Sequence, residues 1–171
     1  MKNDLKLVKI DTKYCDYLRL YDNKVPYNFN NKDLRPFVGI LFEVSGCKYF
    51  APLSSPKPKH LKMKNTIDFL RLDDGKLGAI NFNNMLPVMD NNVIVIDLNK
   101  KYIKKSDIKY QSLLKQQIYW LNRNDEMLYN RACKLYFNYV NGTLNKNVYD
   151  RCCSFKLLED KCKDYNMLKV R

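Results

Sequence analysis

The stretch Lys48-Tyr49-Phe50-Ala51-Pro52-Leu53-Ser54-Ser55-Pro56-Lys57-Pro58-Lys59-His60 joins an apolar run to a short basic loop. Residues 48–53 have the composition of a buried strand. Pro56 and Pro58 cannot donate the hydrogen bonds of a sheet, so the strand is expected to end before them. The stretch therefore predicts a stiff loop at a strand end that presents two hydroxyls, several cations and the only histidine of the chain. Loops of this kind, held by a rigid scaffold, are where functional residues concentrate.

Short strands are predicted on both sides of this loop. Residues 5–10 form a first strand, and residues 37–44 form a buried strand that turns at Ser45-Gly46 and returns through residues 47–53 as a hairpin. Gly39, inside its strand, predicts a bulge or the close approach of another group. Further short strands are predicted over residues 67–72, 76–81, 85–88 and 93–98. Short strands joined by short turns favour a small curled sheet or barrel.

Helical periodicity governs the other parts of the sequence. Asp11 or Thr12 can cap a helix after the first strand, and its inner face would carry Tyr14, Tyr17, Leu18 and Tyr21. From about residue 106 three more helices are predicted. The second of these is capped by Asn124 or Asp125 and ends at Asn141-Gly142, and the third is capped by Ser154.

These patterns predict an α+β fold in a single domain over residues 1–171. A barrel-like core is expected over about residues 5–100, and a helical region over about residues 104–171 packs against it. Apolar residues make up 46% of the chain, which is enough for a sizeable core.

The charge of the chain favours a polyanionic partner. Thirty-one Lys and Arg against eighteen Asp and Glu give a net charge of +13. The partner can be nucleic acid or an acidic membrane surface, and the alternative is a basic protein with no such partner. Residues 44–67 contain five lysines and no acid, so the local field is strongest around the loop.

Several classes of protein lack support in the sequence. There is no GxGxxG, Walker A or GxSxG motif, and nothing marks a carboxylate pair or cluster that would hold a metal, so no cofactor and no metal site is predicted. No apolar run approaches the roughly 18 residues that span a membrane. The six cysteines do not have the spacing of a disulfide framework, and reduced thiols in a cytoplasm are expected.

The loop residues are suited to the cleavage of RNA. The substrate brings its own nucleophile, the 2′-hydroxyl beside the scissile phosphate. The protein has only to orient this group and stabilise the charge that develops on phosphorus, and cations and hydroxyl donors can do so without a metal. Lys57 can act on a phosphate as a point charge, and Ser54 and Ser55 can donate hydrogen bonds to its oxygens. Alternatively, the four residues Ser-Ser-Pro-Lys form only a solvated turn.

The order of several motifs resembles one known family. These motifs are Lys24-Val25-Pro26, Pro36-Phe37-Val38-Gly39-Ile40, residues 48–57, Leu77-Gly78-Ala79-Ile80-Asn81, Met85-Leu86-Pro87-Val88 and Ser154-Phe155-Lys156-Leu157-Leu158-Glu159. Together they cover nearly the whole chain, and the Ala-Pro-Leu-Ser-Ser-Pro-Lys run is the most specific. The chain resembles the endoribonuclease toxins of type III toxin–antitoxin systems, the ToxN/AbiQ family.

The resemblance implies an SH3-like barrel with added helices, related to the MazF and CcdB toxins. It implies a bacterial cytoplasmic, metal-independent endoribonuclease that leaves 2′,3′-cyclic phosphate and 5′-hydroxyl ends. It also implies inhibition by a pseudoknot antitoxin RNA, which the toxin cuts from a precursor, and a closed protein–RNA hetero-oligomer. The other substrates would be cellular or phage RNA, in phage abortive infection or plasmid maintenance.

The resemblance also suggests the residues of the site. Ser54, Ser55 and Lys57 match the family's loop motif, where Ser54 stands at a position that often carries threonine, and Tyr14 matches a functional tyrosine. We expect these four residues to be catalytic. The residues expected to bind RNA are Tyr27, Lys32, Arg35, Lys59, His60, Lys62 and Lys64.

Two alternatives remain open from the sequence. Between Pro26 and Pro36 the register is ambiguous, because a tyrosine and a lysine of the family can match Tyr27 and Lys32, Phe29 and Arg35, or mixtures of these. For the whole protein, the alternative function is a non-catalytic RNA-binding module. Such a module would need the charge of the loop but not two adjacent serines.

Overall fold

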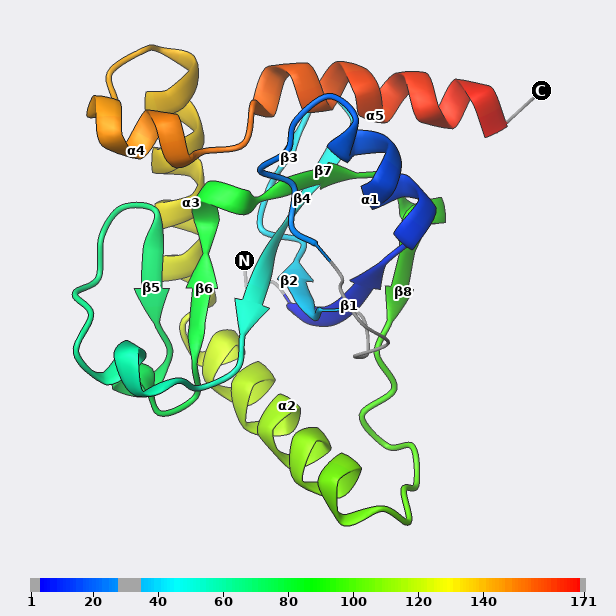
Figure 1. The fold of residues 1–171 in the computed structure, drawn as a ribbon, viewed down its shortest axis with the longest axis vertical. Coiled ribbons are helices and arrows are strands. Elements are labelled where there is room, and N and C mark those ends of the chain that lie inside the picture. The colour runs from blue at the N-terminus through cyan, green and yellow to red at the C-terminus, as the bar shows by residue number, and fades with distance from the viewer. Residues whose placement is uncertain (1–3, 28–34, 170–171) are drawn as a thin grey trace.

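The computed structural model describes residues 4–27 and 35–169, and Figure 1 shows their arrangement. The strands are β1 (Lys6–Ile10), β2 (Phe37–Gly39), β3 (Glu43–Val44), β4 (Cys47–Ser54), β5 (Phe69–Arg71), β6 (Ala79–Asn81), β7 (Leu86–Val88) and β8 (Val93–Val95). The helices are α1 (Thr12–Arg19), α2 (Lys105–Arg123), α3 (Asp125–Val140), α4 (Lys146–Arg151) and α5 (Phe155–Lys169), with short 3₁₀ turns at Pro58–Leu61 and Asp73–Gly75. The expected α+β fold is confirmed.

The sheet is antiparallel in every pairing and is built around β4. Its order is β5-β6-β4-β2-β1-β8, and β3 and β7 pair with the first half of β4. Strand β4 therefore changes partners along its length, from β3 and β7 at Lys48 to β6 at Ser54. Among the described residues β5 and β8 are the two ends of the sheet, and no pairing joins them. The sheet is curled around a core (Figure 1), and the strand pairs among the described residues do not close it into a barrel.

The hairpin before the loop forms as its turn residues predict. Ser45 and Gly46 both adopt positive φ, 53° and 78°, which is the conformation of a tight two-residue hairpin turn. The prediction of one continuous strand over residues 37–44 is wrong, because the regular strand is interrupted between Gly39 and Glu43. Leu41 and Phe42, inside the interruption, still exchange backbone hydrogen bonds with Tyr49 of β4. The close approach expected at Gly39 is confirmed, since a Cβ there would lie 2.4 Å from the ring of Phe50.

The helices cover the two ends of the sheet. Figure 1 shows α5 along one end, beside α1 and β7, and α2 extending from the other end. Asp11 caps α1 by accepting a hydrogen bond from the backbone N–H of Tyr14, and Asn124 stands at the junction of α2 and α3, as predicted. The short helix α4 was not predicted. Sheet and helices share one cluster of buried apolar residues.

A buried carboxylate fastens α5 to the sheet and to α3. Glu159 is 1% exposed, and its Oε1 accepts hydrogen bonds from the hydroxyls of Tyr49 on β4, at 2.8 Å, and Tyr136 on α3, at 2.6 Å. Lys156 Nζ contacts the other oxygen at 2.6 Å. Burial first, and then the carboxylate, raise the pKa of Tyr49, so its hydroxyl stays a proton donor. A buried charge needs such partners, because an unpaired one is costly.

Replacing Glu159 tests this joint. Glu159→Ala leaves two buried hydroxyls without an acceptor, and we expect the free energy of unfolding to fall by about 2–4 kcal/mol. Asp160→Ala removes an exposed carboxylate from the same helix and should change it by less than about 0.5 kcal/mol. Urea denaturation measures the free energy of unfolding of both variants. Equal changes would show that the contacts of Glu159 do not stabilise the packing of α5 on the sheet and α3.

Candidate active site and nucleic-acid interface

The predicted loop lies at the exposed end of β4. Ser54 is the last residue of the strand and is partly buried, whereas Ser55 and Lys57 are exposed. Asn81 Nδ2 on β6 donates a hydrogen bond to Ser54 Oγ at 3.3 Å. Because this oxygen accepts from Asn81, its own proton is available for an acceptor outside the protein. The chain thus holds one hydroxyl in place and presents a second hydroxyl and an ammonium group beside it.

Two glycines allow the loop to lie directly on the turn between β5 and β6. A Cβ on Gly78 would lie 1.9 Å from the carbonyl oxygen of Ser54, and one on Gly75 would lie 2.6 Å from that of His60. Both glycines also have positive φ, 96° and 93°, which other residues rarely adopt. The backbone of the loop is therefore supported at both of its ends by the same turn.

The surface beside the serines is basic. Lys57, Lys59, Lys62 and Lys64 are all exposed, and none has an ion-pair partner within the described ranges. Like charges this close together attract a polyanion and repel one another, so the surface is suited to a chain of phosphates. The predicted cations of the loop and of the segment that follows it are thus all at the surface.

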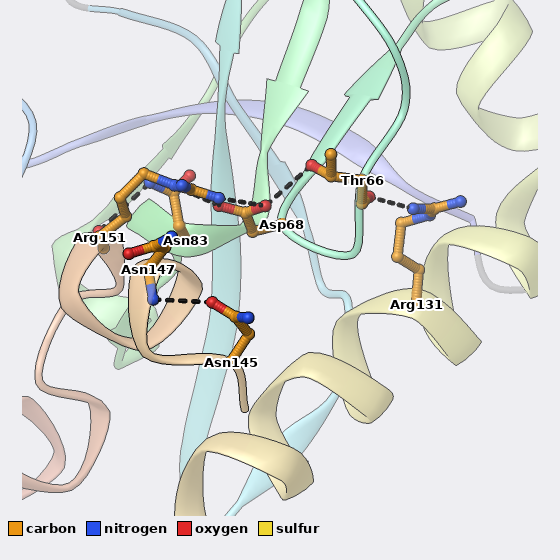
Figure 2. Close-up of polar contacts among 7 residues, drawn as sticks. All are labelled: Thr66, Asp68, Asn83, Arg131, Asn145, Asn147 and Arg151. Atoms are coloured by element: carbon orange, nitrogen blue, oxygen red, sulfur yellow. Dashed lines mark hydrogen bonds and ion pairs between the residues drawn. The ribbon is translucent and has the colours of Figure 1, made fainter. Parts of the chain in front are cut away.

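The far end of this basic segment is tied to the helices, as Figure 2 shows. Asp68 is buried, and its carboxylate accepts from Arg151 Nε at 3.0 Å and from the Thr66 hydroxyl at 2.8 Å. Arg131 on α3 donates to the backbone carbonyl of Thr66. The side chains of α3 and of the end of α4 therefore fix where the segment after the loop rejoins β5. Neither Asp68 nor its partners were singled out in the sequence, since charged residues on separate elements give no local signal.

Tyr14 is not brought to the loop. It has no exposed surface, and its hydroxyl donates to the carbonyl oxygen of Pro87. Pro87 pairs with Tyr49, and Ser54 lies five positions further along β4. At about 3.3 Å per residue this places the Tyr14 hydroxyl roughly 16 Å along the strand from the serines. Burial raises its pKa, so the side chain acts here as a core residue, and its catalytic role stays a prediction without support from the geometry.

His60 is buried under the loop rather than exposed on it. It is 2% exposed, its ring faces Phe69, and its Nδ1 makes no hydrogen bond within the described residues. Burial first, and then the charges of Lys59 and Lys57, lower its pKa. The expected exposure of His60 is therefore corrected, because the ring is buried at the 3₁₀ turn of Pro58–Leu61. Its role in binding RNA stays a prediction without support from the geometry.

The remaining predicted residues lie before β2. Leu53 N donates to the carbonyl of Pro36 at 2.9 Å, so the antiparallel register of β2 and β4 brings Arg35 beside Ser54. Tyr27 is 56% exposed, with the guanidinium of Arg19 4.1 Å from its ring centre. Lys32 and Phe29 lie outside the described residues, so the ambiguity of register there stays open.

Asn81 is a site residue that sequence reasoning missed as such. It lies inside a predicted strand and inside a motif of the resemblance, but nothing in its neighbourhood indicated a partner across the sheet.

The described residues contain no group of three His, Cys, Asp or Glu side chains arranged to hold a metal ion. None of the helices described is long and apolar enough to cross a membrane.

Comparison with known proteins places the chain in a family. The family described as "Toxin ToxN, type III toxin-antitoxin system" matches residues 6–163. Endoribonuclease ToxN of Bacillus thuringiensis subsp. kurstaki is 33% identical over 168 residues, covering 96% of this chain and 86% of that protein. Endoribonuclease AbiQ of Lactococcus lactis subsp. lactis is 26% identical, over 97% of this chain and 92% of the relative.

Solved structures agree with this. One comes from work on selective toxin inhibition by a non-coding RNA pseudoknot in type III systems. It has a TM-score of 0.81 and 33% identity, over 96% of this chain and 99% of the other. The lactococcal anti-phage endoribonuclease AbiQ has a TM-score of 0.79 and 25% identity, over 95% and 98% of the two chains. The family match spans nearly the whole described fold, including the loop after β4 and the helix that carries Glu159. The protein belongs to the ToxN toxin family of type III toxin–antitoxin systems.

Proposed function

We propose that the protein is a sequence-selective, metal-independent endoribonuclease toxin, and that its site is the loop after β4. The observation that carries this proposal is the exposed group of Ser55 and Lys57 beside the oriented hydroxyl of Ser54, at the edge of a basic surface. The relatives named endoribonucleases support it, as does the family match.

The chemistry follows from what the loop offers. The ribose 2′-oxygen attacks the adjacent phosphorus, the bond to the 5′-oxygen breaks, and the proton of the 2′-hydroxyl is lost as the leaving oxygen gains one. The products carry a 2′,3′-cyclic phosphate and a 5′-hydroxyl. Intramolecular attack needs no nucleophile from the protein, because the reacting atoms are already close. Ser54, Ser55 and Lys57 would stabilise the added negative charge on the phosphate, and Asn81 and Gly78 would hold Ser54 in place.

Further parts of the proposal rest on the family. A pseudoknot antitoxin RNA would be cut from its precursor by the toxin, would then inhibit it, and would close with it into a protein–RNA oligomer. One solved relative is described with selective toxin inhibition by an RNA pseudoknot, and another as anti-phage, which supports a role in defence against phage. The likeness also supports an SH3-like barrel in a single domain, although the strand pairs among the described residues leave the sheet open. Lys59, Lys62 and Lys64, with Arg35 and Tyr27, would bind RNA.

The first test is cleavage of RNA in EDTA. Purified protein that is folded and free of RNA should cut a single-stranded RNA in EDTA, with a cyclic phosphate at the new end. A substrate carrying a single 2′-deoxyribose on the 5′ side of the cut should bind with similar affinity but remain intact. Mass spectrometry of the products checks both results. Comparable cleavage of the deoxy substrate, or a phosphoserine on the enzyme, would refute the mechanism, and intact RNA throughout would favour the non-catalytic binder.

Lys57→Ala should lose RNA cleavage by about 10²–10³-fold, because it removes a charge next to the transition state. Its folding should be unchanged, since Lys57 is exposed. Lys134→Ala, on the exposed face of α3, removes the same charge away from the loop and serves as the control. Single-turnover rates measure the effect, and similar rates for the two variants would place the site elsewhere.

The stability of the protein should depend on the protonation of His60. Burial and the neighbouring lysines lower the pKa of this group below that of the unfolded chain, about 6.5, so the unfolded state binds the extra proton. The stabilising effect of the neutral ring is present above pH 6.5 and is lost as the pH falls below it. The free energy of unfolding should therefore fall more steeply from pH 7 to pH 5 in the native protein than in His60→Gln. Parallel curves from urea denaturation at several pH values would contradict this assignment.

A further inference from the structure

A hollow of about 750 Å³ lies next to the loop, on the side of α2. It is lined by Pro56 of the loop, by Lys76 and Leu77 of the turn before β6, and by residues of α2 between Lys105 and Gln116. Leu77 directly precedes Gly78, which contacts the carbonyl of Ser54, so the hollow is continuous with the proposed site. Its volume is in the range of pockets that hold small organic molecules.

The hollow is fixed by a buried hydrogen bond. Gln117 on α2 is 1% exposed, and its Nε2 donates to the carbonyl oxygen of Leu77 at 2.8 Å. This bond joins α2 to the turn before β6, which also supports the loop. The distance between the hollow and Ser54 is therefore set by packed structure rather than by a mobile linker.

The lining combines apolar surface with positive charge. Ile108 is 47% exposed, and with Leu77 and Leu113 it gives the hollow an apolar part. Lys105 and Lys109 lie on the side of the hollow formed by α2. Within the described ranges these two lysines have no ion-pair partner, and no acidic residue lines the hollow. Lys76 is exposed and pairs with the half-exposed Asp73 at 3.8 Å, and such a pair is weak. An apolar surface half-exposed between cations is suited to a planar ring flanked by anions.

We propose that this hollow binds one unpaired nucleobase of the RNA next to the cut, with Lys105 and Lys109 on its flanking phosphates. The inference rests on the proposed function, because the hollow lies beside the cut only if the scissile phosphate binds at Ser54 and Ser55. Base contacts with apolar surface and phosphate contacts with lysine are the two usual sources of affinity for single strands. The hollow is then a specificity-determining subsite: the base that it accepts sets which phosphate reaches the serines.

The test uses an RNA oligonucleotide that spans a mapped cut and carries a 2′-deoxyribose on the 5′ side of that cut, so that it binds without reacting. A series of such oligonucleotides has one abasic residue at each of the positions flanking the cut. For the native protein, one position should lose affinity by about tenfold or more when its base is removed, and the others should lose much less. The affinities are measured by fluorescence anisotropy at constant salt.

Two variants, each with a control, test whether the base at that position binds in the hollow. Ile108→Ala should weaken binding of the intact oligonucleotide and have little further effect on the abasic one, because the two changes remove the same contact. Ile103→Ala, a fully exposed isoleucine that does not line the hollow, is its control. Lys109→Ala should reduce the salt dependence of binding by about one counterion, and Lys115→Ala, exposed on the same helix outside the hollow, should change it less.

The outcomes separate the two proposals. If the protein cuts no RNA in the mapping step, the proposed function fails, and the subsite fails with it. If cleavage is intact but no abasic position weakens binding, or if Ile108→Ala weakens intact and abasic RNA equally, the subsite alone is refuted. Loss of affinity on Lys109→Ala with no dependence on any base would show a phosphate contact only, which also overturns a base-binding hollow.

Discussion

The site depends on a contact between two backbones. The loop after β4 lies on the turn before β6 with no side chain between them, because Gly75 and Gly78 carry none. Any Cβ at Gly78 would overlap the carbonyl oxygen of Ser54. Since the contact is made by main-chain atoms, it fixes the direction of the strand end irrespective of side-chain rotamers. Groups that stabilise a transition state must be in place before the reaction, and this backbone contact holds the end of the strand in one position.

Polar groups inside the protein extend the support from the turn to the helices. The Asp68 carboxylate ties the segment after the basic loop to Arg151. Glu159, on α5, ties the first half of β4 to α3 and α5. A buried carboxylate with three hydrogen-bonding partners, such as Glu159, is specific in a way that apolar packing is not, because only one arrangement satisfies it. The helices thus determine the shape of the site although they contribute no residue to the loop itself.

The sequence predicted those parts of the structure whose cause is local. The turn at Ser45-Gly46, the cap at Asp11 and the strand end before Pro56 each follow from the residues present, and each is confirmed. Helical periodicity also placed Tyr14 on the inner face of its helix, where it is buried. Its hydrogen bond to the carbonyl of Pro87 and the packing of Phe50 against Gly39 join distant parts of the chain, and local pattern could not give these partners. His60 is an intermediate case, because its place in a basic loop suggested exposure whereas a single 3₁₀ turn reversed its direction. Asn81 was quoted within a motif, but its hydrogen bond to Ser54 arises only from strand pairing.

The position of Glu159 and Arg151 in the chain has a consequence for synthesis. Strand β4 and the basic segment leave the ribosome long before the two residues that complete their buried polar contacts. Until then the Tyr49 hydroxyl and the Asp68 carboxylate lack those partners, and the N-terminal sheet is incomplete as a folding unit. The loop therefore gains its full support only when the last helices have been made, so a nascent or truncated chain would carry the residues of the site without its architecture.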